Sequence, residues 1–371
     1  MSRLPSAYLD QFSEPPGYMN FASLGPPSRR AAEAVSTLVG KLAESGEEIG
    51  DLAFEALSSA RRAAARLYGV SPERAMVVSS TSEALFHVAL GLRGGNVVVP
   101  EGEFVANVYP WLRAQELGIV DEVRRVPLHD GRLEPSAVAE AVDSATRVVS
   151  VSLVSYSVGF RTDPAELREA AGDALLVVDV IQAAGAFPVP LGVADLVVAG
   201  ARKWLRAGFG IAGMAVSERL LERLEPTLTG WTGVEQFLDF TVPEPHPPLA
   251  DAGRFSMGGA LALSAAGYAA AVDVVDEGGI AAIAETVLDR AARVEEVLRR
   301  VGATVRAPWR HDGERAGIVT FRMPGEEATA TVARLGGAGF TVSDRAGWVR
   351  VAVHATTRPE AIEELGRVLG G

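Results

Sequence analysis

The sequence predicts an α/β protein in which a large domain with a doubly wound, mainly parallel sheet precedes a smaller α+β domain. From Met76 onward, five short apolar runs of strand character alternate with helical segments, which is the order that builds a parallel sheet. An acid, Asp179, and a lysine, Lys203, follow two consecutive runs. Beyond a proline-rich segment at 242–249, further strands and helices fit a compact second unit.

Three segments divide the chain. Residues 1–17 are rich in proline and predict an irregular N-terminal arm. Residues 18–249 form the expected large domain, which opens with a helix capped by Ser28 and a second helix over about 49–68. Residues 250–371 form the expected small domain, which begins with a long alanine-rich helical stretch.

Composition excludes several classes of protein. The 371 residues have a net charge of −12 and include no cysteine. Basic residues form no block, so nucleic acid is not an expected partner. Without thiols, disulfides, thiolate metal sites and a cysteine nucleophile are excluded. No apolar run is long enough to cross a bilayer, and the N-terminus has no apolar signal core. We expect a cytoplasmic enzyme that does not contact a membrane.

The acid and the lysine are expected to meet. Asp179 ends the run 175–179, and Lys203 lies in a glycine-flanked segment after the run 196–198. Because the carboxyl ends of parallel strands open onto one crevice, both side chains should face the same site.

A hydroxyl-rich turn opens another predicted helix. Thr81 and Ser82 follow the run 76–78 after two further serines, Ser79 and Ser80. Free backbone N–H groups, hydroxyl donors and the positive end of the helix dipole make such a turn a seat for phosphate. A plain Ser/Thr N-cap is the alternative interpretation. Phe104, which follows the run 96–100, is either a ligand contact at a strand end or a core residue.

The segment 208–213, GFGIAG, has the letters of a dinucleotide-binding loop. That loop should open a helix directly, whereas the residues after Gly213 indicate a strand. We therefore reject a dinucleotide site here. The five histidines are scattered and none form a metal-binding pair, so no metal is expected.

The remaining parts are a lysine, an acid at a neighbouring strand end and a hydroxyl-rich helix N-terminus. Pyridoxal 5′-phosphate needs these three: an amine for its aldehyde, a carboxylate for its ring nitrogen and donors for its phosphate. The sequence therefore predicts this cofactor.

At these residues the chain resembles the class V aminotransferases of pyridoxal-phosphate fold type I, which include cysteine desulfurases, selenocysteine lyase and isopenicillin N epimerase-like proteins. The resemblance spans nearly the whole chain and is most specific at Asp179-Val180-Ile181-Gln182 and at Lys203 in the segment ARKW. It implies that Lys203 forms the Schiff base and moves the Cα proton, that Asp179 pairs with the pyridinium and that Gln182 reaches the phenolic oxygen.

The resemblance also implies further site residues. Thr81 and Ser82 match the phosphate turn, and Phe104 falls where desulfurases have a histidine stacked on the ring. Arg350 matches the arginine that holds a substrate carboxylate, although outside this motif it reads as a surface arginine. A homodimer with active sites near the subunit interface is expected.

At several positions the chain departs from the family pattern, and these departures limit what can be inferred about the substrate. Arg202 replaces the usual histidine before the lysine, and we expect it to meet the phosphate. Tyr156 stands where desulfurases have an asparagine. Gly259 stands where many relatives have a threonine that reaches the partner's cofactor, which puts that contact in doubt. The absence of cysteine excludes a desulfurase that works through a protein persulfide.

The expected activity is that of an aminotransferase acting on an amino acid or amino compound. A C–S or other β-eliminating lyase and an epimerase are alternatives that share the same first proton abstraction, and a cofactor-free binding protein is an alternative of another class. Specificity is expected to lie in residues such as Ser23, Tyr156 and Trp231. The sequence leaves the substrate open.

Overall fold

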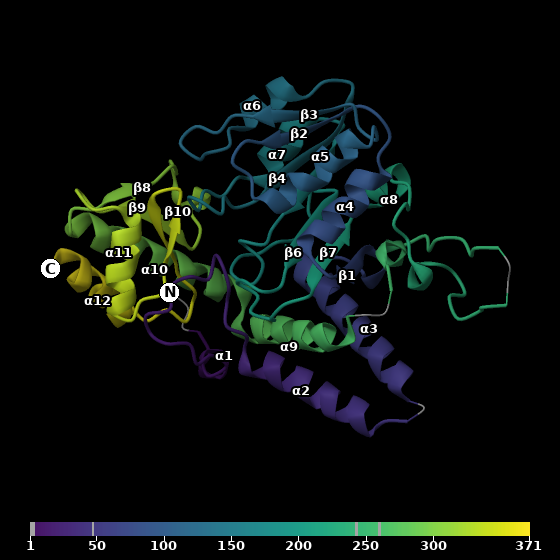
Figure 1. Ribbon diagram of the computed structural model, residues 1–371, viewed down its shortest axis with the longest axis horizontal. Helices are drawn as coiled ribbons and strands as arrows, with labels where there is room; N and C mark the ends of the chain where they lie inside the picture. Colours follow the sequence, from purple (N-terminus) through teal and green to yellow (C-terminus); the bar gives the residue numbers. More distant parts are fainter. Residues whose placement is uncertain (1–3, 47, 242–243, 259–260) are drawn as a thin grey trace.

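The computed structural model describes residues 4–46, 48–241, 244–258 and 261–371. The structure has a seven-stranded and a four-stranded sheet. In Figure 1 the smaller sheet lies at the left and the larger one near the centre, with helices packed on each. The predicted α/β architecture with a smaller α+β unit is confirmed. None of the helices in these ranges is both long and apolar enough to cross a membrane.

The large sheet has the strand order β1-β7-β6-β5-β4-β2-β3, in which β2 to β6 are parallel. Its strands are β1 (Ala75–Val78), β2 (Asn96–Pro100), β3 (Glu122–Val126), β4 (Thr146–Ser152), β5 (Leu175–Asp179), β6 (Leu196–Gly200) and β7 (Ala212–Val216). Central strands such as β5 are buried on both faces, which explains their continuous apolar runs rather than an alternating pattern.

Helices cover both faces of this sheet, as expected for a doubly wound fold. One apolar core packs α4, α5 and α8 on the first face, and the other packs α3, α6, α7 and α9 on the second. The helices of this part are α1 (Ser6–Leu9), α2 (Arg29–Glu44), α3 (Ile49–Tyr68), α4 (Thr81–Gly91), α5 (Tyr109–Glu116), α6 (Pro135–Ala141), α7 (Pro164–Ala171), α8 (Glu218–Arg223) and α9 (Ala262–Gly278).

Strand β7 runs antiparallel to both of its neighbours, β6 and β1. Only a loop, without a crossover helix, joins β6 to β7, and a return that short can build an antiparallel pair but not a parallel one. The glycine run 208–213 therefore leads into a strand, as predicted, and Lys203 lies in the connecting loop.

The small sheet has the order β10-β11-β9-β8, with all pairs antiparallel. Alternate residues of β9 and β11, including Phe321 and Val351, pack against its three helices, and the opposite face carries polar residues such as Thr320 and Arg350. The elements are α10 (Ile280–Arg300), β8 (Thr304–Arg306), β9 (Ile318–Arg322), α11 (Ala328–Gly337), β10 (Ser343–Arg345), β11 (Trp348–Ala352) and α12 (Pro359–Gly370).

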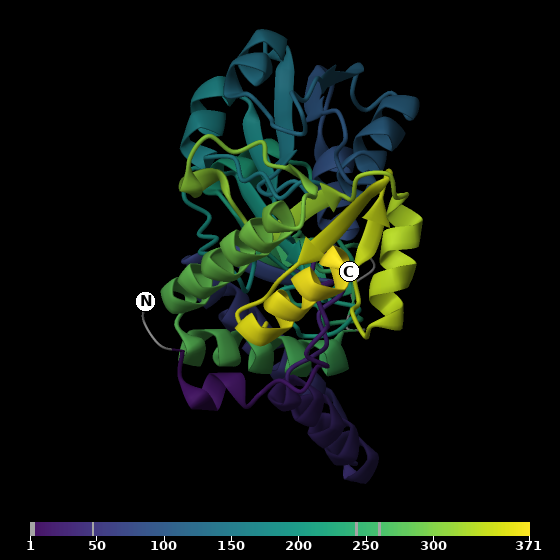
Figure 2. The same ribbon diagram turned by 90° about the vertical axis from the view of Figure 1, so that its left-hand side faces the viewer.

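The alanine-rich stretch expected as one long helix is two helices, because Gly279 adopts a positive φ of 73° between α9 and α10. Helix α9 packs against α2 and α3, as Figures 1 and 2 show, and Arg66 of α3 pairs with Asp273 of α9. The domain limits at 17 and 249 remain predictions. The packing of α9 favours a boundary near Gly279 instead.

A buried ion pair joins the N-terminal arm to the loop that carries Lys203. The guanidinium of Arg206 is 1% exposed, bonds to Glu14 and lies 3.9 Å from the centroid of the Phe12 ring. The Oγ1 atom of Thr356, which follows β11, donates to Glu14 at 2.5 Å. The arm, the lysine loop and the small domain therefore meet at one charge pair.

Replacing Glu14 should destabilise the protein far more than replacing a surface acid. Glu14→Gln leaves the buried charge of Arg206 unpaired, and we expect the free energy of unfolding to fall by about 3 kcal/mol. The matched control is Glu363→Gln, which breaks an exposed pair with Arg300 and should cost less than about 1 kcal/mol. Urea unfolding measures both. Equal losses would contradict the structural role given to Glu14.

Candidate active site

Asp179 and Lys203 lie together at the carboxyl edge of the large sheet. Asp179 is the last residue of β5, and Lys203 follows the end of the adjacent parallel strand β6. Both side chains are almost fully buried. The structure thus brings together the two residues that the strand pattern predicted to meet.

Burial shifts the pKa values of Asp179 and Lys203 in opposite directions. It raises the pKa of Asp179 to about 6, against the hydrogen bond of 2.8 Å from the Ile181 N–H and the charge of Lys203. Burial likewise lowers the pKa of Lys203 to about 7. Asp179 opposes that shift, whereas Arg202 and other arginines add to it. A substantial part of the Lys203 amine is therefore neutral at neutral pH, as a nucleophile or base requires.

Gln182 fixes the N-terminal segment beside the lysine loop. Its Nε2 donates to the carbonyl of Ala22 at 3.0 Å, and its Oε1 accepts from Trp204 Nε1 at 2.8 Å. Gly25 lies so close that an added Cβ would be 2.0 Å from the Lys203 carbonyl oxygen. Gln182 thus has a positioning role here that the sequence did not reveal, and its contact with a cofactor stays a prediction.

The hydroxyl-rich turn adjoins the same loop. Thr81 is the first residue of α4, and its Oγ1 accepts from the N–H of Gly200, the last residue of β6, at 2.9 Å. A Cβ on Gly200 would lie 3.5 Å from both Thr81 Oγ1 and a terminal nitrogen of Arg202. Ser80 caps the helix, and the first N–H groups of a helix lack intrahelical acceptors. The structure thus shows the N-cap at Ser80, with Ser82 in the first turn of the helix. An N-cap and a phosphate site are compatible, and the phosphate site at this helix start stays a prediction.

Phe104 offers an open aromatic face beside the amine. Its side chain is 37% exposed, and Lys203 Nζ lies 5.5 Å from the ring centroid. Tyr156 contacts the same ring edge-on, with 5.5 Å between centroids. Phe104 is therefore not a core residue, and a flat ligand can stack on it.

Three predicted substrate residues from distant parts of the chain meet around Arg350. Its two terminal nitrogens donate to the carbonyl of Tyr156 at 2.7 Å and to the hydroxyl of Ser23 at 2.6 Å. Arg350 is 1% exposed and has no carboxylate within ion-pair distance in the described part of the chain. Burial lowers its pKa to about 9, with a further contribution from Arg345. A buried cation without an acid suits an anionic ligand.

Sequence reasoning missed two residues of this region. Arg345, in β10, donates to the Ser23 hydroxyl at 3.1 Å; its place across a short turn from β11 was the available signal. Glu103 accepts from the N–H of Ser152 at 2.7 Å, and burial raises its pKa to about 7. Ser152 is the register partner of Asp179.

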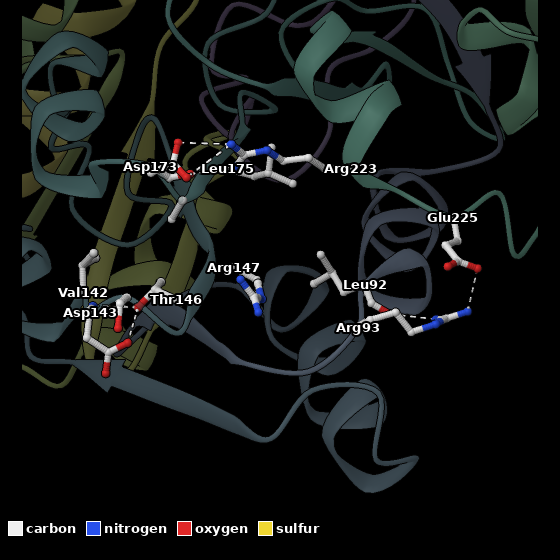
Figure 3. Close-up of a pocket in the computed structure, with 12 residues that line it drawn as sticks. Leu92, Arg93, Val142, Asp143, Thr146, Arg147, Asp173, Leu175, Arg223 and Glu225 are labelled. Carbon is white, nitrogen blue, oxygen red and sulfur yellow. Dashed lines mark hydrogen bonds and ion pairs between the residues drawn. The ribbon is translucent and has the colours of Figure 1, made fainter.

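A cavity of about 620 Å³ lies elsewhere, at the edge where β4 and β5 begin. Figure 3 shows Arg93 and Arg223 there, bonded to Glu225 and Asp173. Because Leu175 starts the strand that Asp179 ends, this cavity is on the opposite edge of the sheet and is not part of the site.

Comparison with known proteins identifies the family. The profile described as Aminotransferase class-V matches residues 29–353. The chain belongs to the class V aminotransferase family. Its cofactor is pyridoxal 5′-phosphate, which agrees with the prediction from Asp179, Lys203 and the hydroxyl-rich turn.

Two relatives of this chain are named for different activities. A probable cysteine desulfurase of Methanothermobacter thermautotrophicus is 33% identical over 218 residues, 56% of this chain and 54% of the relative. The match therefore spans about half the length of that relative. An uncharacterized aminotransferase, YcbU, of Bacillus subtilis is 28% identical over 326 residues, 84% of each chain.

Solved structures share the fold. The apo cysteine desulfurase of Thermococcus onnurineus superposes with a TM-score of 0.88 at 22% identity, covering 100% of this chain and 98% of the other. The cystine C–S lyase C-DES, solved with cysteine persulfide, gives a TM-score of 0.86 at 19% identity, covering 95% and 97%. These likenesses establish fold type I for this member of the class V family.

The amine of Lys203 should titrate near pH 7 in the cofactor-free protein. The chain has two lysines, Lys203 and Lys41 of the exposed face of α2, so isotope-labelled dimethylation gives few NMR signals to follow against pH. Arg202→Gln removes a cation that lowers the pKa of Lys203, and the midpoint should therefore rise. Arg113→Gln, on the surface of α5, is the control. An unchanged midpoint in Arg202→Gln would contradict the proximity of the two cations.

Proposed function

We propose that this class V family member is an aminotransferase acting on an amino acid or amino compound. The observation that carries the proposal is the setting of Lys203: a buried amine whose neighbouring charges come from Asp179 and from arginines 202, 345 and 350. Arginine remains charged and does not exchange protons at neutral pH. One lysine is therefore placed to take a proton from the substrate and return it elsewhere on the same molecule.

The residues present fit the cofactor. The guanidinium of Arg350, whose Nε is buried without a hydrogen-bond partner, provides a contact for a carboxylate. The exposed ring of Phe104 provides one for a flat ring, and the N–H groups at the start of α4 provide one for a phosphate. The proposed cofactor ligands are Lys203 for the carbonyl carbon, Asp179 for the ring nitrogen, Gln182 for the phenolic oxygen, Phe104 for the ring face, and Thr81, Ser82 and Arg202 for the phosphate.

When bound, pyridoxal phosphate supplies a carbonyl that condenses with amines and a ring that accepts the electron pair released at Cα. Asp179 holds a proton at the ring nitrogen, for which its burial and its position at the strand end suit it. Arg350 binds the substrate carboxylate and thereby sets which Cα bond faces Lys203. Lys203 then moves the Cα proton, a step for which a positioned base typically contributes 10²- to 10⁴-fold.

Transamination should be visible in the cofactor itself. On mixing the holoenzyme with an amino donor, we expect the visible absorption band to give way to a near-ultraviolet band while one 2-oxo acid forms per site. Lys203→Ala should slow this by at least about 10²-fold. Borohydride should fix the cofactor's mass on Lys203 and not on Lys41. Ammonia and a 2-oxo acid formed repeatedly, without loss of the visible band, would identify a lyase instead.

A lyase is the second candidate because Tyr156 lies against Phe104, where its phenol can protonate a leaving group. The C–S lyase among the structural neighbours has the same fold. A cysteine desulfurase working through a protein persulfide does not fit a chain without cysteine. Tyr156→Phe in the same assay separates the candidates: elimination should be lost, whereas transamination should be retained.

We further propose a homodimer with its interface beside the start of α4. A cavity of about 490 Å³ there is lined by Ser79, Trp231, Met257 and Leu261, and Trp231 and Met257 are about half exposed. Gly259, where relatives carry threonine, lies outside the described residues. Sedimentation should give a dimer at micromolar concentration, and Met257→Glu should shift it toward monomer. Leu117→Glu, an exposed residue following α5, is the control. A monomeric wild type would refute the proposal.

A further inference from the structure

Arg345 and Arg350 lie side by side on the helix-free face of the small sheet. In the β10–β11 pair, Ser343 is opposite Arg350 and Arg345 is opposite Trp348. Because side chains alternate along a strand, these positions share one face. Both arginines donate to the same atom, Ser23 Oγ, at 3.1 and 2.6 Å. Their guanidinium groups are therefore within two hydrogen-bond lengths of each other.

No acid of the described ranges balances this pair. Neither arginine has a carboxylate within 4.0 Å among the described residues, although most arginines of the chain have one. Beside Arg350, its own Nε and the hydroxyls of its two cross-strand neighbours, Ser343 and Thr320, are buried without hydrogen-bond partners. Two cations sharing one neutral hydroxyl, amid unsatisfied polar atoms, indicate a place for more than one negative group.

The cationic pair faces the reacting centre. Arg350 donates to the carbonyl of Tyr156, whose ring contacts Phe104. Lys203 Nζ lies 5.5 Å from the centroid of that Phe104 ring. Arg345 joins the group through the Ser23 hydroxyl that it shares with Arg350, and the charges of both arginines accordingly lower the pKa of Lys203. Arg202 lies beside Thr81, at the proposed phosphate seat. One substrate carboxylate on Arg350 leaves Arg345 as the remaining cation without an anion.

We propose that the preferred substrates are amino acids whose side chain ends in a second carboxylate, and that Arg345 is the ligand of that carboxylate. The proposal rests on the proposed function in that the amino group reacts at Lys203. The proposal goes beyond the proposed function by naming the substrate class. A planar guanidinium binds a carboxylate through two parallel hydrogen bonds, which a side-chain amide cannot accept in the same way.

The test compares acids with their neutral amides. The holoenzyme is mixed with L-glutamate, L-aspartate, L-glutamine or L-asparagine, and the rate of change of the cofactor spectrum is measured. We expect the acids to react at least about tenfold faster than the amides, since a site built for a polar group rejects analogues that lack it. Arg345→Gln should reduce that ratio about tenfold or more, and Arg345→Lys should give an intermediate ratio. Arg300→Gln, an exposed arginine of the same unit, should leave it unchanged.

A binding measurement provides a readout that does not depend on turnover. Glutarate should bind the holoenzyme more tightly than valerate, its monocarboxylate counterpart, and Arg345→Gln should weaken glutarate selectively. Thermal unfolding of each variant checks that it is folded. Equal losses for acids and amides, or equal binding of glutarate and valerate, would overturn the proposal and assign Arg345 to the α-carboxylate or to structure.

The two proposals fail in different ways. If the holoenzyme converts amino acids without regard to a second carboxylate, the aminotransferase proposal stands and the substrate class is wrong. If it converts none of them but binds glutarate through Arg345, the acid-binding role of Arg345 stands and the reaction is wrong.

Discussion

The burial of the Lys203 amine next to Asp179 is the constraint on which the rest of the site depends. In a low-dielectric setting a charged amine and a charged carboxylate are both costly, and each lowers the cost of the other. Burial therefore lowers the pKa of the amine and raises that of the acid, while the charge of each group opposes the shift of the other. Lys203 lies close to the strand end because the loop that carries it begins directly after Gly200, the last residue of β6.

The site is assembled from three parts of the chain. The segment after the N-terminal arm supplies Ser23, the large sheet supplies Asp179 and Lys203, and the small sheet supplies Arg345 and Arg350. Two interactions hold these parts together. Gln182 donates a hydrogen bond to the carbonyl of Ala22, and Arg206, in the loop of Lys203, forms an ion pair with Glu14. The same contacts that stabilise the fold therefore set the distance between the amine of Lys203 and the two arginines, Arg345 and Arg350.

Charge is distributed unevenly. The chain carries a net charge of −12, yet the reacting centre contains more cations than acids. The arginines of the surface are largely neutralised by neighbouring carboxylates, as in the pair of Arg300 and Glu363. Those of the site are not. In the proposed site a cofactor phosphate and substrate carboxylates would supply the missing negative charge, which would explain why buried guanidinium groups are tolerated here.

The sequence by itself determined the fold class, the cofactor and the meeting of Asp179 with Lys203. These follow from local patterns, because apolar runs that alternate with helices place successive strand ends on one edge. It also located Thr81 at a helix start.

Only the tertiary structure decided which side chains complete the site. The place of Arg345 across a short turn from β11 was a local signal, but it does not specify a role, because that role arises from pairing with β11 and from the approach of Ser23, more than 300 residues away in the chain. The structural bonds of Gln182 and the pairing of Glu14 with Arg206 likewise depend on contacts between distant segments. Such contacts depend on how distant segments pack and become buried. The local pattern of residues does not specify these individual long-range pairs.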